Sequence, residues 1–372
     1  MDRKKKELVD HLDKLEDVYR DFFHWLAGQY DPTSGGFYYA KSSSTNRQFA
    51  PDIESTAQAL NIIIRNNLLK DMPEKMKLAM ISFFKGKQDP ATGYFFDDHP
   101  AMKKDEVMVH RALNYCTSAL QYLGSEPLYA LPVEAMAAPD YIKSPETYLG
   151  KWKSIDLRNS WRGCDLLATS CVYIGQMEEN ERIPFLKEAV SFLESIQDPK
   201  TGLWGEGSLY VRISGTFKLH TFYSSFQIPM PKTDRIYQSI LHCLRTEEAG
   251  DMCYIRNPID LLSYANLQIP HGELKEIIDI TIKNMRKLKR PDGGFSREIE
   301  TSPPAPNVAQ IKAGEVYPDM PEPVVLSKGL YEGDMNASTQ TTLIRQQLYK
   351  MVGIPIVPLK ESLDFFKLYF NE

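Results

Sequence analysis

Two kinds of helical segment alternate along the 372-residue chain. Segments of the first kind are amphipathic and rich in lysine and glutamate, which is typical of outer helices with one solvent-facing side. They cover 5–28, 74–87, 181–196, 232–246 and 272–289. Segments of the second kind carry little charge beyond their first turns and are rich in Ala, Leu, Ser and Tyr, as expected of inner helices that are buried nearly all round. They cover 52–68, 106–123, 158–174, 214–226, 256–266 and 334–352.

A recurring turn follows four of the outer segments. Its copies are Gln29 to Phe37, Gln88 to Tyr94, Gln197 to Trp204 and Arg290 to Phe295. In the first three, Asp-Pro ends a helix, a glycine permits positive φ, and an aromatic residue can pack under the turn. The repeated acids of these turns therefore have a structural role in our interpretation. They are Asp31, Asp89 and Asp198.

The alternation predicts an all-α fold, an α/α toroid of about six helical hairpins, because repeats tens of residues apart indicate stacked supersecondary units. Length alone allows one or two domains, and the repeat favours a single domain over 1–372. A third outer helix is expected within 128–150, where prolines weaken the pattern. A segment at 359–371 is expected to close the ring beside the first helix.

Charge and hydropathy exclude several classes of partner. Lys and Arg total 44 against 49 Asp and Glu, so the net charge of -5 offers no general attraction to nucleic acid or anionic lipid. No run approaches the roughly 18 apolar residues of a membrane span. Charged residues also follow the basic start where a signal peptide needs an apolar core. We therefore expect a cytoplasmic protein without nucleic-acid partner or membrane span, whose oligomeric state stays open.

The cysteines indicate neither disulfides nor a zinc cluster. They form no C-x-x-C pair, and each lies in a mostly apolar helical stretch, which predicts buried, reduced thiols. The five are Cys116, Cys164, Cys171, Cys243 and Cys253.

The Gln-Asp-Pro-x-Thr-Gly-x-Trp turns and the segment Asp52-Ile53-Glu54-Ser55-Thr56-Ala57 resemble the terpenoid cyclase and protein prenyltransferase superfamily of α/α toroids. The resemblance covers nearly the whole chain and concerns architecture. Six-hairpin glycosidases and sugar epimerases share this plan and have similar turns, so the resemblance implies the fold and leaves the reaction open. In such toroids the loops that enter the inner helices surround a central funnel, where we expect a site.

Ionisable residues gather in the predicted first turns of the inner segments. They are Asp52, Glu54, His110, Arg111, Arg158, Arg162, Asp165, Lys218, His220, Arg256, Asp260 and Asp334. Acids at these positions can simply cap a helix, which is an alternative for Asp52 and Asp334. Cations are unfavourable there unless they face an anion, so the four cations in this set indicate a ligand. They are Arg158, Arg162, Lys218 and Arg256.

The segment from Asp52 is similar to the Asp-x-Asp-Asp-Thr-Ala motif with which class II terpene cyclases protonate an alkene or epoxide. Asp52 matches the first acid and Glu54 replaces the second, but Ser55 stands in place of the third. The segment 334–339 has a weaker similarity to the same outline. The resemblance thus implies a cyclase whose acid motif is incomplete.

A second local resemblance concerns zinc. His220-Thr221-Phe222-Tyr223 is similar to a zinc-ligand segment of prenyltransferase β subunits, but no Asp-x-Cys pair precedes it at a suitable distance. A tetrahedral zinc site needs at least three protein ligands. We expect no metal and no cofactor, and keep His220 and Tyr223 as acid-base candidates, with a buried structural histidine as the alternative.

The mixture of ionisable and aromatic residues suits a polar ligand, since sugars stack on aromatic rings and accept paired hydrogen bonds from charged side chains. Asp52 and Asp334 are the preferred acid-base pair, because the first and last inner helices become neighbours when a ring closes. The predicted catalytic set is Asp52, Glu54, Asp334, His220 and Tyr223. The predicted substrate-binding set is Arg158, Trp161, Arg162, Lys218, Arg256 and Asn336.

The first hypothesis is thus a cytosolic lyase, hydrolase or epimerase that acts by general acid-base chemistry on a carbohydrate or related polar small molecule. The alternatives are a terpenoid-cyclase-like enzyme acting on an isoprenoid and a toroid that binds a ligand or partner without catalysis. The proline-rich segment 299–331 is too irregular for a helix and is a candidate lid, with a surface wrap or an oligomer contact as alternatives.

Overall fold

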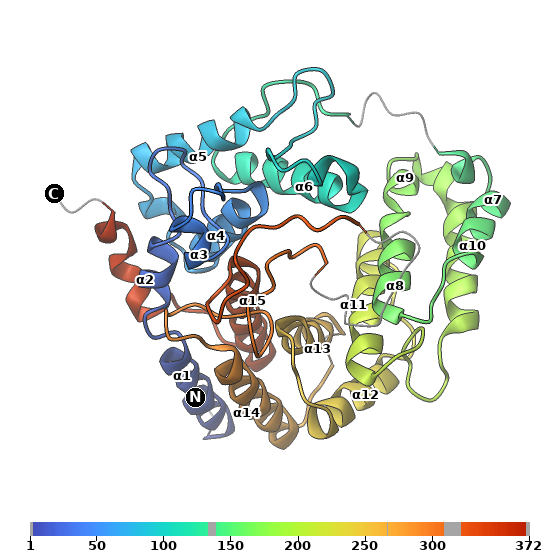
Figure 1. The fold of residues 1–372 in the computed structure, drawn as a ribbon. Helices are drawn as coiled ribbons and strands as arrows, with labels where there is room; N and C mark the ends of the chain where they lie inside the picture. The colour runs from blue at the N-terminus through green and yellow to red at the C-terminus, as the bar shows by residue number, and fades with distance from the viewer. Residues whose placement is uncertain (1–2, 133–138, 266, 309–320, 370–372) are drawn as a thin grey trace. The chain divides into compact units, whose positions relative to one another are not determined.

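The computed structural model describes residues 3–132, 139–265, 267–308 and 321–369 (Figure 1). Its helices run from α1 to α15, and in these ranges the only β-structure consists of isolated bridges. The predicted all-α class is confirmed. Across the same ranges, no helix combines the length and apolar character that crossing a lipid bilayer requires.

The contacts divide the chain into two compact units. Unit 1 comprises Met1–Ala135, Ile282–Tyr349 and Ile354–Glu372, and unit 2 comprises Met136–Thr281 and Lys350–Gly353. The single domain and the closed ring of six hairpins stay predictions.

Unit 1 contains the first and last helices of the chain. They are α1 (Arg3–Val18), α2 (Phe22–Ala27), α3 (Lys41–Ser44), α4 (Ile53–Arg65), α5 (Glu74–Gly86), α6 (Glu106–Tyr122), most of α15 (Met335–Val352) and the 3-10 helices η1 (Leu69–Asp71), η2 (Met102–Lys104) and η5 (Lys360–Leu368).

Unit 2 contains the middle of the chain. Its elements are η4 (Asp140–Ile142), α7 (Pro145–Lys153), α8 (Ser160–Thr169), α9 (Val172–Gly175), α10 (Glu179–Ile196), α11 (Leu209–Ser225), α12 (Thr233–Thr246) and α13 (Met252–Ala265). The helix α14 (His271–Leu288) runs from unit 2 into unit 1. Helix α11 contacts both α8 and α13.

The predicted segments match these helices closely, with three informative differences. The first outer segment is broken into α1 and α2 at Asp21, whose φ is 62°. The inner segment predicted at 158–174 is divided into α8 and α9. Helix α11 begins at Leu209, five residues before the predicted start, because Ser208 caps it and Glu247 accepts the backbone N–H groups of its first two residues.

The early start of α11 corrects the placement of two candidate site residues. Lys218 and His220 lie in the C-terminal half of α11 and not in its first turns. In α8, Arg158 precedes the helix, and Asn159 is its N-cap. The sequence pattern placed Lys218, His220 and Arg158 in the first turns of inner helices, and this placement is wrong. The helices themselves were predicted correctly.

Two of the predicted segments, 128–150 and 359–371, lie only partly within the described residues. The outer helix expected within 128–150 corresponds to η4 and α7, and residues 133–138 lie outside the described residues. The closing segment is the 3-10 helix η5, and the end of its predicted range, 370–371, is likewise outside. η5 contacts α2, so the last described helix lies beside the second helix of the chain in unit 1 (Figure 1).

The acids of the turns hold the local backbone, as predicted. Asp31, Asp89 and Asp198 each accept hydrogen bonds from backbone N–H groups two and three residues further on. Burial by itself would raise the pKa of Asp198, but hydrogen bonds from Lys200 and Arg212 lower it to about 2. All three carboxylates thus cap their turns, and that of Asp198 does so in its ionised form.

A side-chain nitrogen joins three of the turns to a neighbouring outer segment. Gln88 Nε2 donates to the carbonyl oxygens of Gly93 and Tyr129 at 3.1 and 2.9 Å. Gln197 Nε2 does the same with Gly202 and Pro231. In the fourth turn the donor is Lys289, whose Nζ lies 2.6 Å from the Gly293 oxygen and 2.8 Å from the Arg20 oxygen. Lysine therefore replaces glutamine in one copy of the same bridge.

Close backbone contact fixes the glycine of each turn. Gly93 has φ 74°, and a Cβ on it would lie 2.0 Å from the carbonyl oxygen of Ala130. Gly293 has φ 97°, and its Cβ would lie 2.3 Å from the oxygen of Asp21 at the start of α2. The turn that precedes the last inner helix thus packs on the first outer helix, as the closing of a ring requires.

Three of the four turns are also attached to the inner helix that follows them. The backbone N–H of the turn aromatic donates to a hydroxyl on that helix: Phe37 to Thr56 of α4 at 2.9 Å, Trp204 to Thr216 of α11 at 3.4 Å, and Phe295 to Ser338 of α15 at 3.2 Å. Serine and threonine in inner helices are therefore positioned by the turns.

We expect Lys289→Gln to leave stability nearly unchanged, because glutamine makes the same bridge in the other turns. Burial lowers the pKa of Lys289 to about 8, so the amide also avoids the cost of burying a charge. Lys289→Ala should cost about 2 kcal/mol, about 1 for each lost hydrogen bond. Chemical denaturation near neutral pH measures both. An equal loss in the two variants would contradict the shared role.

Candidate functional site

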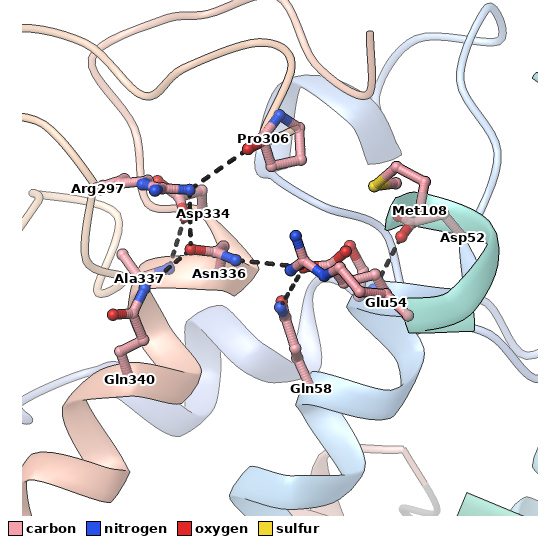
Figure 2. Close-up of polar contacts among 12 residues, drawn as sticks. Asp52, Glu54, Gln58, Met108, Arg297, Pro306, Asp334, Asn336, Ala337 and Gln340 are labelled. Carbon is pink, nitrogen blue, oxygen red and sulfur yellow. Dashed lines mark hydrogen bonds and ion pairs between the residues drawn. The ribbon is translucent and has the colours of Figure 1, made fainter. Parts of the chain in front are cut away.

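A chain of polar contacts in unit 1 connects α4, α6, α15 and the segment after the fourth turn (Figure 2). At its centre, Glu54 Oε1 accepts hydrogen bonds from Gln58 Nε2 at 2.9 Å and Asn336 Nδ2 at 3.3 Å. The same oxygen forms a short ion pair with Arg111 of α6. Residues 54 and 336 are thereby joined although 282 positions separate them in the sequence.

Asn336 extends this chain to the other side. Its Oδ1 accepts from Gln340 Nε2 at 2.9 Å and from the guanidinium of Arg297 at 3.4 Å. The Arg297 guanidinium also reaches the carbonyl oxygen of Pro306 at 3.4 Å. Figure 2 shows Asn336 between Arg297 and Glu54, with Asp334 beside Arg297 and Asp52 on the side of Glu54.

Three buried oxygens on the first turns of α4 receive no hydrogen bond from any residue that the structure describes. They are Asp52 Oδ2, Glu54 Oε2 and Gln58 Oε1, and we call them the acceptor cluster. Each side chain also has a bonded atom that holds it in place: Ser55 N donates to Asp52 Oδ1 at 2.8 Å, and Gln58 Nε2 is bonded to Glu54 Oε1. The cluster is thus positioned but not satisfied, which is costly for buried acceptors.

A second carboxyl lies beside Asp52 at the start of α4. Both oxygens of Asp97 accept from Ile53 N, at 3.2 and 3.0 Å, and Lys87 Nζ is 3.2 Å away. Burial, and then the negative charge of Asp97, raise the pKa of Asp52 to about 8. Burial also raises the pKa of Asp97, against the effect of Lys87. Asp52 is therefore a carboxyl that holds its proton at neutral pH.

Asp334 precedes α15 as Asp52 precedes α4, but the hydrogen bonds to its carboxylate differ from those of Asp52. Its Oδ1 accepts from Ala337 N at 2.7 Å, and its Oδ2 accepts from Arg297 N at 2.7 Å and Ser302 Oγ at 3.0 Å. Burial raises the pKa of Asp334 to about 6, because these hydrogen bonds only partly offset it. Both oxygens are occupied, so the contacts favour a structural role over the predicted catalytic one.

The other predicted site residues lie in unit 2. Lys218 Nζ forms an ion pair with Asp165 at 2.8 Å and lies 5.4 Å from the centre of the Trp161 ring. Arg256 pairs with Asp260 at 3.1 Å. Carboxylates of the protein thus face these cations, so the cations by themselves do not require an anionic ligand.

His220 lies between α11 and α13. Its Nδ1 donates to the carbonyl oxygen of Phe217, and its ring centre is 4.9 Å from that of Tyr264. Burial lowers the pKa of His220, so the imidazole is neutral near pH 7. Asp260 opposes this shift only in part.

The remaining candidates have ordinary surroundings. Arg158 is paired with Asp156 at the surface, with its side chain 82% exposed. The backbone N–H of Arg162 donates to the N-cap Asn159. Tyr223 is fully buried beside Trp204, and burial raises its pKa. For these three residues a site role stays a prediction without further support.

Sequence reasoning missed Asp97, Arg297 and Gln58, and it left Arg111 outside the site. For Asp97 and Arg297, the sequence does contain a signal, a constant spacing from the glycine of the preceding turn. Asp97 and Arg297 each lie four residues after the positive-φ glycine of their turn, at Gly93 and Gly293. Counting from that glycine would have placed both at the mouth of an inner helix.

All five cysteines are buried, free thiols, as predicted. No group of three or more His, Cys, Asp or Glu side chains is arranged to hold a metal ion in the part of the chain that the structure describes. The candidate lid at 299–331 is irregular at 299–308 and 321–331, and its middle, 309–320, lies outside the described residues. Neither a family model nor a curated protein matches this sequence.

We expect Asp52→Asn to change how stability depends on pH. Because folding raises the pKa of Asp52 from 3.8 to about 8, the folded state binds the proton more tightly, and the free energy of unfolding falls as pH rises between these values. Asparagine mimics the protonated acid and removes this loss. The variant should therefore gain stability relative to the wild type as pH rises from about 5 to about 8.

Denaturant unfolding of both proteins across this pH range measures the difference, in which the contributions of groups that do not interact with Asp52 cancel. Asp97 interacts with Asp52, so part of its contribution remains in the difference. A constant difference across the range would show that Asp52 titrates normally.

Proposed function

We propose that the acceptor cluster of unit 1 is the reaction site of an enzyme that acts by general acid-base chemistry on a carbohydrate or a related hydroxyl-rich small molecule. The observation that carries the proposal is the set of buried oxygens Asp52 Oδ2, Glu54 Oε2 and Gln58 Oε1, which no described protein donor reaches. Hydroxyl groups of a substrate would supply the missing partners, because they can donate to Glu54 Oε2 and Gln58 Oε1 and can accept the proton that Asp52 carries on Oδ2 at neutral pH. A hydrocarbon could not.

The two carboxyls differ in a way that suits an acid and a base. Asp52 is protonated at neutral pH for the reasons given above, so it is the proposed general acid. Glu54 is paired with Arg111 through one oxygen, which leaves Oε2 as the proposed base. Environments that separate the protonation states of two neighbouring carboxyls are the usual means of assigning these roles.

Lyase, hydrolase and epimerase reactions all fit this pair, because each needs one group to remove a proton and another to donate one. Arg111 is a partly exposed cation beside Glu54, with its side chain 37% exposed. It is suited to orient a substrate oxygen or carboxylate.

The isoprenoid alternative receives less support. The position that holds the third acid of the class II cyclase motif is Ser55, whose backbone N–H is used to cap α4 through Asp52. The hydrogen bonds and the ion pair to Glu54 come from arginine and amide side chains. A polar substrate accounts for these groups better.

The first test is Glu54→Gln, assayed on neutral oligosaccharides, oligouronates and their reducing-end epimers by product analysis. On whichever substrate the wild type converts, turnover should fall by about 10² or more, the usual scale for a general acid or base.

Glu332→Gln is the matched control, because Glu332 is also a buried carboxylate but has both oxygens bonded to Ser42, at 2.7 and 2.5 Å. It should lose stability and keep its turnover when assayed well below its melting temperature. Normal turnover of Glu54→Gln, or an equal loss in the control, would remove Glu54 from the mechanism.

The pH profile tests Asp52 separately. If Asp52 donates a proton, kcat/KM should fall as pH rises through about 8, where the free enzyme loses that proton. Asp52→Asn should be slow at every pH and lack this limb. A wild-type profile that stays flat to pH 9 or above, about one unit beyond the pKa, would assign the acid to another group.

A further inference from the structure

Unit 2 contains a continuous half-buried face formed by three helices. We call it the α8–α11–α13 face, and its residues are Trp161, Asp165, Phe217, Lys218, His220, Arg256, Asp260 and Tyr264. On α8 and α13 the members are spaced by four residues, so each helix presents them in one row. All except Phe217 are partly exposed.

Contacts across the helices show that the three rows adjoin. The ammonium of Lys218 joins α11 to α8 through Asp165 and the Trp161 ring. On the other side, the guanidinium of Arg256 lies 4.2 Å from the centre of the Phe217 ring, and His220 contacts Tyr264. Aromatic and hydrogen-bonding groups therefore alternate over one surface.

The charge on this face is balanced. Its two cations are paired with its two carboxylates, and His220 is neutral near pH 7 because burial lowers its pKa. A face without net charge has no general attraction for phosphates, nucleic acid or polyuronates. It nevertheless presents donors and acceptors side by side.

The only imidazole described on the α8–α11–α13 face is that of His220, and its Nε2 is a free acceptor. The hydrogen bond from Nδ1 to the Phe217 carbonyl fixes the tautomer, so Nε2 carries the lone pair. In the described part of the chain nothing donates to this Nε2, and a hydroxyl group is the simplest donor that suits it.

We propose that the α8–α11–α13 face is a binding site for a neutral oligosaccharide. Sugar rings offer apolar C–H faces to Trp161 and Tyr264. Their hydroxyls can donate to His220 Nε2 and to the paired carboxylates, and they can accept from the paired cations. This site is separate from the acceptor cluster and does not depend on Glu54 being catalytic.

Tryptophan fluorescence can report on this face alone. The protein has four tryptophans, and three of them, Trp25, Trp152 and Trp204, are at most 3% exposed. Trp161 is the partly exposed one. Stacking of a sugar on this face should therefore change the emission of Trp161.

The experiment titrates the full-length protein with cello-, xylo-, manno- and maltohexaose, and with hexagalacturonate as the charged comparison, at up to about 10 mM, above the Kd of weak binding. At least one neutral hexasaccharide should change the fluorescence. In Trp161→Phe this change should disappear, while calorimetry still detects binding. Tyr264→Ala should weaken binding about tenfold, the effect of losing one ring contact.

Two controls separate this site from others. Tyr173→Ala removes another half-buried tyrosine of unit 2, one that contacts Tyr141 and not this face, and should bind normally. Glu54→Gln should leave the fluorescence change of Trp161 intact, even where it abolishes turnover. No response to any neutral hexasaccharide, binding of hexagalacturonate alone, a response that persists in Trp161→Phe, or equal effects of Tyr264→Ala and Tyr173→Ala would each overturn the proposal.

Discussion

The bridge from a turn to the next outer segment is the contact on which the hairpins depend. A side-chain nitrogen of Gln88, Gln197 or Lys289 binds the carbonyl of its own turn glycine and a second carbonyl on the neighbouring segment. Backbone carbonyls buried at such a junction need donors. One nitrogen satisfies both, and it thereby ties the turn to the neighbouring outer segment.

This dependence explains which features could be predicted from the sequence. Asp-Pro and glycine act through local backbone geometry, so the turns and most helices followed from residue order alone. Helix α11 did not, because Glu247 of a later segment fixes its start. The same holds for the site: Glu54 and Asn336 were chosen from their own segments, but Asp97 and Arg111 gain their importance only from contacts that folding creates.

The turns also determine what surrounds the inner helices. Because the turn aromatic is attached to a hydroxyl of the following helix, the residue just beyond it is carried to the start of that helix. In unit 1 this brings Arg297 to α15. Asp97, which follows the second turn, instead lies at the start of α4, the inner helix before that turn. The segments just beyond two turns thus place an ionisable side chain at the start of an inner helix, where chain variation can change chemistry without changing the fold.

Asp52 and Asp334 show how such a repeat can separate structure from function. Each caps its inner helix through the backbone N–H of the third residue on, Ser55 or Ala337. They differ in the second oxygen. In Asp334 it is bonded to Arg297 N and Ser302, while in Asp52 it meets no described donor and lies near the charge of Asp97. Capping needs only one oxygen, so the second is free to take a proton and exchange it with a bound molecule. The same residue type at the same place is therefore a fixed cap in α15 and, in our proposal, an acid in α4.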